Sequence, residues 1–172
     1  MKPIFKYALK LFVIMSLGMF LTTLIGDYIF GDEIKLSAIL FKSSTFGLFM
    51  TIFFTIAQRY GIKEADVSNI TDENLKPQYE CEIVTSLSPD QITSKLNTTH
   101  EFKDVVNKGN KIQLRARWSL QSWGEKIAIE TIKNENNLYT YRIKSKPIVW
   151  TTIADYGKNR KNVNKIINII YA

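Results

Sequence analysis

The sequence has very few of the residues that build cross-links and metal centres. It contains one cysteine, Cys81, and one histidine, His100, among 172 residues. A single cysteine excludes an internal disulfide and fits a reducing compartment. One cysteine and one histidine cannot form a structural zinc site by themselves. The chain also lacks a glycine-rich phosphate loop, an internal repeat and a low-complexity segment, and we expect no cofactor.

Long apolar runs are present, and two of them occupy the N-terminal third of the chain. They cover residues 11–30 and 36–57, separated by a short polar break at 31–35. A helix needs about 20 apolar residues to cross the bilayer core, and both runs reach that length. The sequence therefore predicts a transmembrane helical hairpin over residues 1–58. A linker over 59–78 and one soluble domain over 79–172 follow.

The positive charges around the hairpin predict its orientation. Cytoplasmic loops carry an excess of lysine and arginine, and both ends of the hairpin carry more of them than the break does. We therefore expect both termini and the soluble domain in the cytoplasm, beneath a bacterial inner (plasma) membrane. No small-x-small cleavage site follows the first run, so we expect that run to be retained. The charged residues counted are Lys2, Lys6, Lys10, Lys35, Arg59 and Lys63.

Two ionisable residues, Asp27 and Lys42, lie within the apolar runs. Both should lie toward the outer ends of their helices. They could form a pair across the hairpin, or each could extend separately to the outer interface, which costs less free energy. Because no chain of ionisable groups crosses the full thickness, a proton or ion path within one copy is not expected.

The remainder of the sequence predicts an α+β domain with an antiparallel sheet. Alternating runs indicate strands, and the motif Ser88-Pro89-Asp90-Gln91 indicates a capped helix that ends near Asn97. A second helix opens at 155–157 with Asp155 as its cap. Val163, Ile166, Ile167 and Ile170 form its buried stripe. The predicted order is β-α-β-β-β-β-α, with both helices on one face of the sheet. Strands are expected over 79–85, 102–106, 111–119, 126–132 and 138–145, and a further strand-like run covers 148–153.

Positive charge increases toward the C-terminus. Residues 59–106 carry five Lys/Arg against nine Asp/Glu, whereas residues 142–172 carry seven against one. This asymmetry predicts a basic face for anionic lipid or an acidic partner, although a solvated surface is the commoner explanation. We select two candidate groups. On the open sheet face they are Arg115, Arg117, Arg142 and Lys144, and at the start of the last helix they are Lys158, Arg160, Lys161 and Lys165.

Aromatic side chains gather around the predicted strands. Trp118, Trp123 and Trp150 accompany Tyr139 and Tyr141. Core packing is the commoner role for such a set. The alternative is an apolar pocket between sheet and helices that holds a lipid or another apolar ligand. Because Trp123 lies in a turn, it is the best candidate for a contact surface.

Catalytic chemistry has little support in the sequence. His100, Glu101 and Asp104 could form a small acid/base cluster, but their spacing matches no catalytic or metal signature. Cys81 lies in an alternating strand, where a small core residue is the usual role. We therefore expect no enzyme and no metal site.

The C-terminal segment over residues 145–163 carries a resemblance to a known family. Ser145-Lys146-Pro147 precedes an Asp-aromatic-Gly-x-Asn-Arg-basic motif at residues 155–161. This arrangement resembles the closing segment of an uncharacterised bacterial domain family, in which a serine-rich basic stretch leads through such a motif into a terminal helix. The resemblance implies a similar local fold. It implies no activity.

These observations lead to two hypotheses of function. The first is a non-enzymatic, membrane-tethered interaction module, a small accessory subunit whose partner is another membrane protein or a second copy. The alternative is a domain that binds anionic lipid or an apolar ligand through the basic sheet face and the aromatic pocket. Nucleic-acid binding is not expected, because no RNA-binding sheet signature appears.

Overall fold

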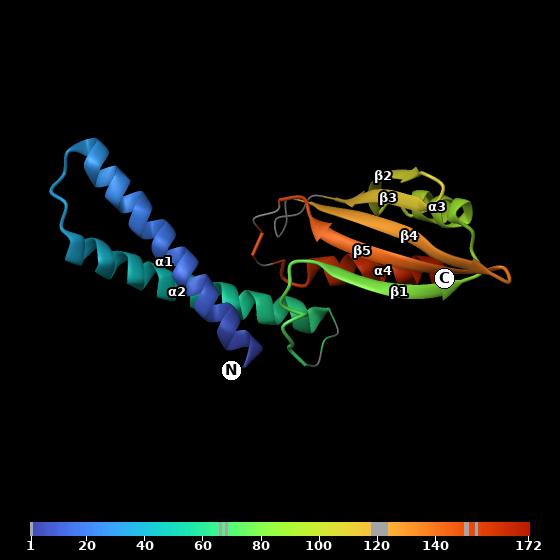
Figure 1. The fold of residues 1–172 in the computed structure, drawn as a ribbon, viewed down its shortest axis with the longest axis horizontal. Coiled ribbons are helices and arrows are strands. Elements are labelled where there is room, and N and C mark those ends of the chain that lie inside the picture. Colours follow the sequence, from blue (N-terminus) through green and yellow to red (C-terminus); the bar gives the residue numbers. More distant parts are fainter. Residues whose placement is uncertain (1, 66, 68, 118–123, 150–151, 154) are drawn as a thin grey trace.

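A computed structural model describes the whole chain except residues 1, 66, 68, 118–123, 150–151 and 154. Two long helices come first, α1 (Pro3–Phe30) and α2 (Leu36–Glu64), and an α+β domain follows (Figure 1). Both helices exceed the apolar runs. They contain 28 and 29 residues, or about 42 Å each. Because α2 continues to Glu64, the expected linker begins inside a helix.

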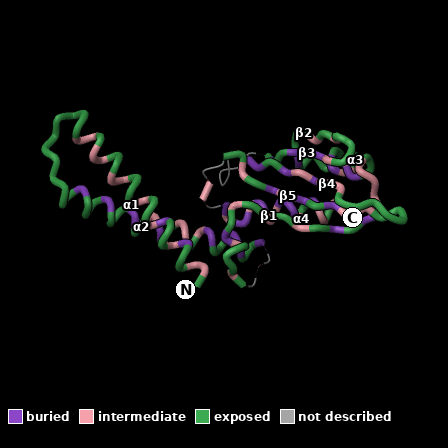
Figure 2. Tube along the Cα trace, in the orientation of Figure 1, coloured by how far each residue is buried: buried purple, intermediate pink, exposed green. Residues whose placement is uncertain are grey.

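Small residues allow α1 and α2 to pack closely. Ile39, Ser43, Gly47 and Thr51 recur every four residues on α2 and are all buried. A Cβ atom on Gly47 would lie 1.9 Å from the Ser16 hydroxyl oxygen and 3.0 Å from its Cβ, so any other residue would require Ser16 to shift. The remaining faces are largely exposed and apolar (Figure 2). Both helices are therefore long and apolar enough to be membrane spans.

The domain contains a five-stranded antiparallel sheet in the order β1-β5-β4-β3-β2. Two helices accompany it, α3 (Pro89–Thr98) and α4 (Lys158–Tyr171), so the predicted order of elements is confirmed. The strands are β1 (Tyr79–Thr85), β2 (Phe102–Asn107), β3 (Lys111–Ala116), β4 (Glu125–Glu135) and β5 (Leu138–Pro147).

The further strand over residues 148–153 is wrong. Among the residues of that run that the structure describes, none belongs to a strand. The chain instead leaves the ladder at Ile148, whose amide donates to the Gly124 carbonyl, and then turns toward α2. The preference of this apolar run for a strand yields to the turn that begins after Pro147.

Both helices cover the same face of the sheet, as the sequence predicts. Ile92 and Leu96 of α3 and Val163 and Ile166 of α4 are fully buried against the inward residues of the strands. The predicted capping box is also confirmed. The Ser88 amide donates to Gln91 Oε1 at 2.8 Å, and the Gln91 amide donates to Ser88 Oγ at 3.4 Å.

Candidate functional site

The end of α2 packs directly against the segment that precedes α4. Gln58 is completely buried, and its Oε1 accepts a hydrogen bond from the Tyr156 amide at 2.8 Å. A Cβ atom on Gly61 would lie 2.1 Å from the Tyr156 carbonyl oxygen, and one on Gly157 would lie 2.6 Å from the Gly61 carbonyl oxygen. Two backbones therefore touch here. We call this contact of Gln58 and Gly61 with Tyr156 and Gly157 the joint.

The joint is continued by an apolar cluster that includes α1. Tyr7 and Leu11 of α1, Ile62 of α2 and Leu75 of the following segment are buried together. The hairpin and the segment after α2 thus share a small core, and Ile153, which precedes α4, is partly buried against it.

The carboxylate of Asp155 organises the start of α4. The N-cap residue is Gly157, with a φ of 70°, rather than Asp155. Asp155 nevertheless accepts hydrogen bonds from the amide of Gly157 at 3.2 Å and from the amide and side-chain nitrogen of Asn159, both at 3.0 Å. A negative charge beside the N-terminal amides of a helix is stabilising. The prediction of Asp155 as the cap residue is therefore wrong, but its carboxylate accepts hydrogen bonds from the first amides of α4 from a position two residues before the cap.

Buried polar side chains extend this network into the domain. Asn159 is completely buried. Its Oδ1 accepts from Ser145 Oγ at 2.6 Å, and its Nδ2 donates to the Pro77 carbonyl at 3.1 Å. Asn162 donates to buried Glu125 at 3.0 Å. The resemblance motif includes Ser145 and Asn159 but predicts no buried network, and no sequence pattern singles out Asn162 or Glu125. Asn159 lies four residues before Val163 and thus continues the buried stripe.

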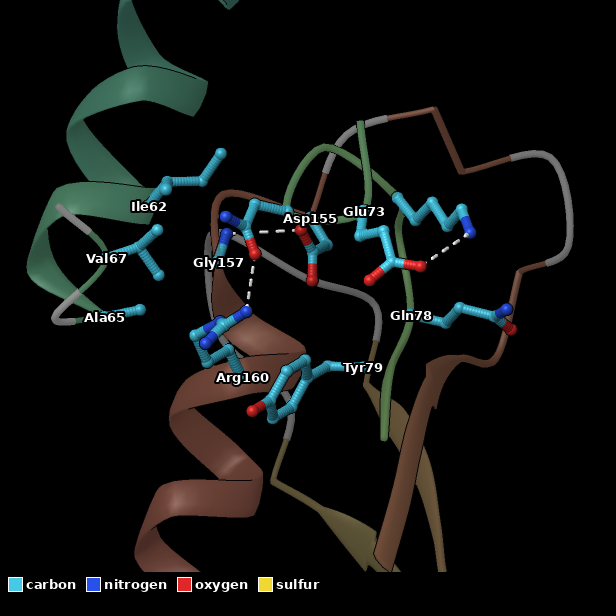
Figure 3. Close-up of a pocket in the computed structure, with 11 residues that line it drawn as sticks. Ile62, Ala65, Val67, Glu73, Gln78, Tyr79, Asp155, Gly157 and Arg160 are labelled. Atoms are coloured by element: carbon cyan, nitrogen blue, oxygen red, sulfur yellow. Dashed lines mark hydrogen bonds and ion pairs between the residues drawn. The ribbon is translucent and has the colours of Figure 1, made fainter. Parts of the chain in front are cut away.

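Arg160 connects α4 to β1 and to the segment after α2. Its guanidinium carbon lies 4.0 Å from the centre of the Tyr79 ring, and its Nη2 donates to Asn74 Oδ1 at 2.6 Å. Figure 3 shows Arg160 beside Tyr79, with Asp155 and Gly157 close by. The adjoining cavity has a volume of about 10 Å³, which is room for roughly one water molecule. This region is therefore a packed connection rather than a ligand pocket.

Two more of the predicted cations on α4 have partners within the chain. Lys161 pairs with Glu64 at the end of α2. Lys165 pairs with Glu101 at 2.7 Å. In the described part of the chain, Lys158 has no ion pair. The start of α4 thus holds elements together, and only Lys158 remains available there for an external anion.

On the open face of the sheet, farther from the hairpin, acidic and basic residues alternate across neighbouring strands. Arg142 pairs with Glu82 at 2.8 Å, and Lys111 pairs with Glu130 at 2.6 Å. The hydrogen bond and charge of Glu82 raise the pKa of Arg142, and those of Lys111 lower the pKa of Glu130. Lys144 pairs with Glu80 at 3.1 Å. Three of the four cations predicted on this face therefore meet carboxylates: Arg142, Lys144 and Arg115, the last at 3.6 Å from Asp104.

Nearer the hairpin, the open face carries a second row with one sign of charge. Register places Lys146 opposite Lys126, Lys126 opposite Arg115, and Arg115 opposite Lys103. We call Lys103, Arg115, Lys126 and Lys146 the cation row. Arg115 lies 3.6 Å from Asp104. Arg117 lies beyond the end of β3 and donates to the His100 carbonyl at 3.1 Å.

The aromatic candidates divide into two groups. Trp118, Trp123 and Trp150 lie outside the described residues. Tyr139 and Tyr141 stack with ring centres 5.8 Å apart. Tyr141 is only 1% exposed and donates to the Leu87 carbonyl at 2.9 Å, and its burial raises its pKa to about 12. Tyr141 therefore belongs to the core.

The residues considered for catalysis point to different partners. Glu101 pairs with Lys165, whereas Asp104 lies near Arg115. Within the described ranges, no three His, Cys, Asp or Glu side chains gather closely enough to hold a metal ion. Burial raises the pKa of the Cys81 thiol, which makes it a weaker nucleophile near neutral pH.

The ionisable residues within the hairpin lie apart from this region. Asp27 is on α1 and Lys42 is on α2. Among the ion pairs of the residues that the structure describes, none joins these two side chains. Asp27 is half-buried and Lys42 is exposed. Separate extension toward an interface remains the simpler prediction for both.

Comparison with known proteins adds no family to this description. No protein-family model matches the chain, and no curated protein matches it. The resemblance of residues 145–163 to an uncharacterised bacterial family stays a prediction. The fold itself defines an α+β protein with two long, exposed apolar helices at its N-terminus.

Proposed function

We propose that this chain is a membrane-anchored, non-enzymatic interaction module, an accessory subunit whose domain docks on a larger membrane protein or on a second copy. The joint is the observation that carries the proposal. Recruitment to a membrane requires only a flexible tether, whereas docking against a neighbouring membrane protein benefits from a fixed orientation. Preorganisation of this kind reduces the entropy that binding would otherwise cost.

The exposed surface of the hairpin supports membrane anchoring. Full burial of one large apolar side chain is worth about 1.5–3 kcal/mol, so a hairpin with this many exposed apolar groups is unfavourable in water. A bilayer, or the helices of a partner, would cover them. Those more than half exposed include Phe5, Val13, Leu17, Ile25, Phe41, Leu48, Phe49, Phe53 and Ile56.

The distribution of cations supports the cytoplasmic orientation within a bacterial inner membrane. Lys2 and Lys6 lie at the start of α1, and Arg59 and Lys63 lie in the last turns of α2, beside the domain. The connection between the helices carries Lys35, which pairs with Glu33 at 3.1 Å. The end that bears the domain thus has the excess of lysine and arginine expected on the cytoplasmic side.

Isolation from native membranes tests the proposal. The tagged full chain should resist carbonate extraction, and in mild detergent it should run with a second protein or a second copy. The Gly61→Ala variant, which disturbs the joint, should lose that partner. Gly18→Ala should keep it, because a Cβ atom at Gly18 meets nothing within 4 Å. A chain that is extracted by carbonate, or that runs as a lone monomer, contradicts the proposal.

A further inference from the structure

The cation row is an unusual arrangement for neighbouring strands of a sheet. Like charges directly opposite one another on neighbouring strands are destabilising. Here four cations are consecutive neighbours across β5, β4, β3 and β2, a span of about 14 Å at the usual strand spacing. Among the described residues, Arg115 is the one member of the row with an ion pair, to Asp104 at 3.6 Å. Lys103, Lys126 and Lys146 have no ion pair within the described part of the chain.

The row lies at the end of the sheet that faces the hairpin. Lys146 is next to the last residue of β5, and Lys126 is the second residue of β4. The arrowhead of β5 and the start of β4 lie on the hairpin side of the domain (Figure 1). The joint lies at this same end. A membrane that contains the hairpin would therefore have its surface close to the cation row.

Two shallow grooves flank the row and share its lysines. The first has a volume of about 710 Å³ and is lined by more cations, among them Arg115, Lys126, Lys146, Lys108 and Lys111, than carboxylates, which are Asp104 and Glu130. The second has a volume of about 410 Å³ and adds Lys76, Ile148 and Val149 to Lys126 and Lys146. Ile148 and Val149 are each 39% exposed. Cationic groups thus lie beside apolar ones, an arrangement that suits an anionic lipid headgroup and the acyl chains attached to it.

We propose that the cation row binds the phosphate groups of anionic phospholipids in the membrane leaflet on the side of the domain. The inference rests on the membrane anchoring proposed above. Lysine ammonium groups bind phosphate as point charges and need no fixed geometry. Anionic headgroups would relieve the repulsion along the row, and the sheet would then lie against the membrane at its hairpin end. The two grooves provide space for headgroups on either side.

Residue-resolved acetylation of the full chain in nanodiscs tests the inference directly. At low salt, an equal mixture of phosphatidylglycerol and phosphatidylcholine should slow acetylation of Lys103, Lys126 and Lys146 about five-fold relative to phosphatidylcholine alone. Lys95, on α3, and Lys133, at the far end of β4, line neither groove and should react at the same rate in both discs. High salt should remove the difference. Equal rates at the row lysines in both discs would overturn the inference.

A matched pair of variants provides a second measurement. K103Q/K126Q/K146Q should lower the affinity of the chain in zwitterionic detergent for phosphatidylglycerol by about a hundred-fold, as measured by native mass spectrometry. K95Q/K133Q/K165Q removes the same charge outside both grooves and should change the affinity little. Without lipid, the first variant should melt at a higher temperature than the wild type, because the repulsion is gone. Equal affinities in the two variants would refute the site.

Two control experiments distinguish the possible reasons for a negative result. Inorganic phosphate added to phosphatidylcholine discs should not protect the row. If it protects as well as phosphatidylglycerol does, the ligand is a soluble anion and the lipid assignment is wrong. If carbonate extracts the wild-type chain from the membrane, the proposed membrane anchoring is itself wrong. An embedded chain whose row ignores phosphatidylglycerol would refute this inference alone.

Discussion

Replacement of Gly61 by alanine should loosen the joint. The new Cβ atom would lie 2.1 Å from the Tyr156 carbonyl oxygen and 2.6 Å from its carbonyl carbon, which is well inside contact distance. These are backbone atoms, so no side chain can rotate away. Overpacking of this kind costs about 1–3 kcal/mol. Alanine recovers up to about 1 kcal/mol in helix propensity, and a net loss of about 1–2 kcal/mol at the joint remains.

Amide hydrogen exchange at Tyr156 measures this loss at the contact itself. The Tyr156 amide donates to Gln58 Oε1 at 2.8 Å, so it exchanges only when the joint opens. A loss of 1–2 kcal/mol corresponds to exchange that is about 5–30 times faster. The measurement uses the full chain in detergent, and it compares the Tyr156 amide with amides of the domain core, which should change little.

Gly18→Ala is the control for this prediction. Gly18 is also in a long helix, but nothing lies within 4 Å of its added Cβ atom. The control should leave Tyr156 exchange unchanged and should gain helix propensity. If Gly61→Ala also leaves the exchange rate of Tyr156 unchanged or slows it, the two backbones do not touch and the fixed orientation of the domain is refuted.

Three other substitutions test separate parts of the structure. Asp155→Ala should lower the free energy of unfolding of the domain by about 3 kcal/mol in urea denaturation, because buried amides, including that of Asn159, lose a charged acceptor. Tyr141 titrates at a pKa of about 12 in the folded chain, against about 10 unfolded. Its contribution is therefore complete below pH 10 and lost as the pH rises to 12, and Tyr141→Phe should remove that loss from a pH series of melting curves. Arg160→Lys should cost about 1 kcal/mol in the same urea assay, because lysine keeps the charge but cannot both cover the Tyr79 ring and reach Asn74.

Each of these substitutions has a comparison within the chain. Asp90→Ala removes an exposed acid from the first turn of α3 and should cost less than about 1 kcal/mol. A loss at Asp155 no larger than this would show that its carboxylate does not organise α4. A Tyr141→Phe chain with the wild-type alkaline transition would contradict the assignment of that transition. Lys158→Ala, which removes an unpaired cation, should be neutral, and an equal effect at Arg160 would argue against the stacking contact.

The features that the sequence predicted correctly are local or periodic. The capping box needs only Ser88 and Gln91, three positions apart, and the stripe of α4 needs only a regular spacing of apolar residues. Each signal is complete within a few turns of one element. The same is true of the apolar runs, whose helical length follows from composition. These are features in which neighbouring residues alone determine the structure.

The joint and the cation row could not be predicted in this way. Gly61 lies in a stretch assigned to a linker, and nothing near it indicates that its partner is the backbone at Tyr156. Alternation placed Arg115 and Arg142 on the open face, but register decides that Arg142 lies opposite Glu82 whereas Arg115 lies opposite Lys103 and Lys126. Register depends on turns and bulges between strands, such as the irregularity in β2 after Lys103.

The joint also has a consequence for the order in which the protein matures. Gln58 and Tyr156 are 98 residues apart, so the ribosome completes the hairpin long before it supplies the other half of the contact. The helices must therefore enter their surroundings without help from the domain. The domain becomes fixed to them only after Tyr156, in the turn before α4, has emerged.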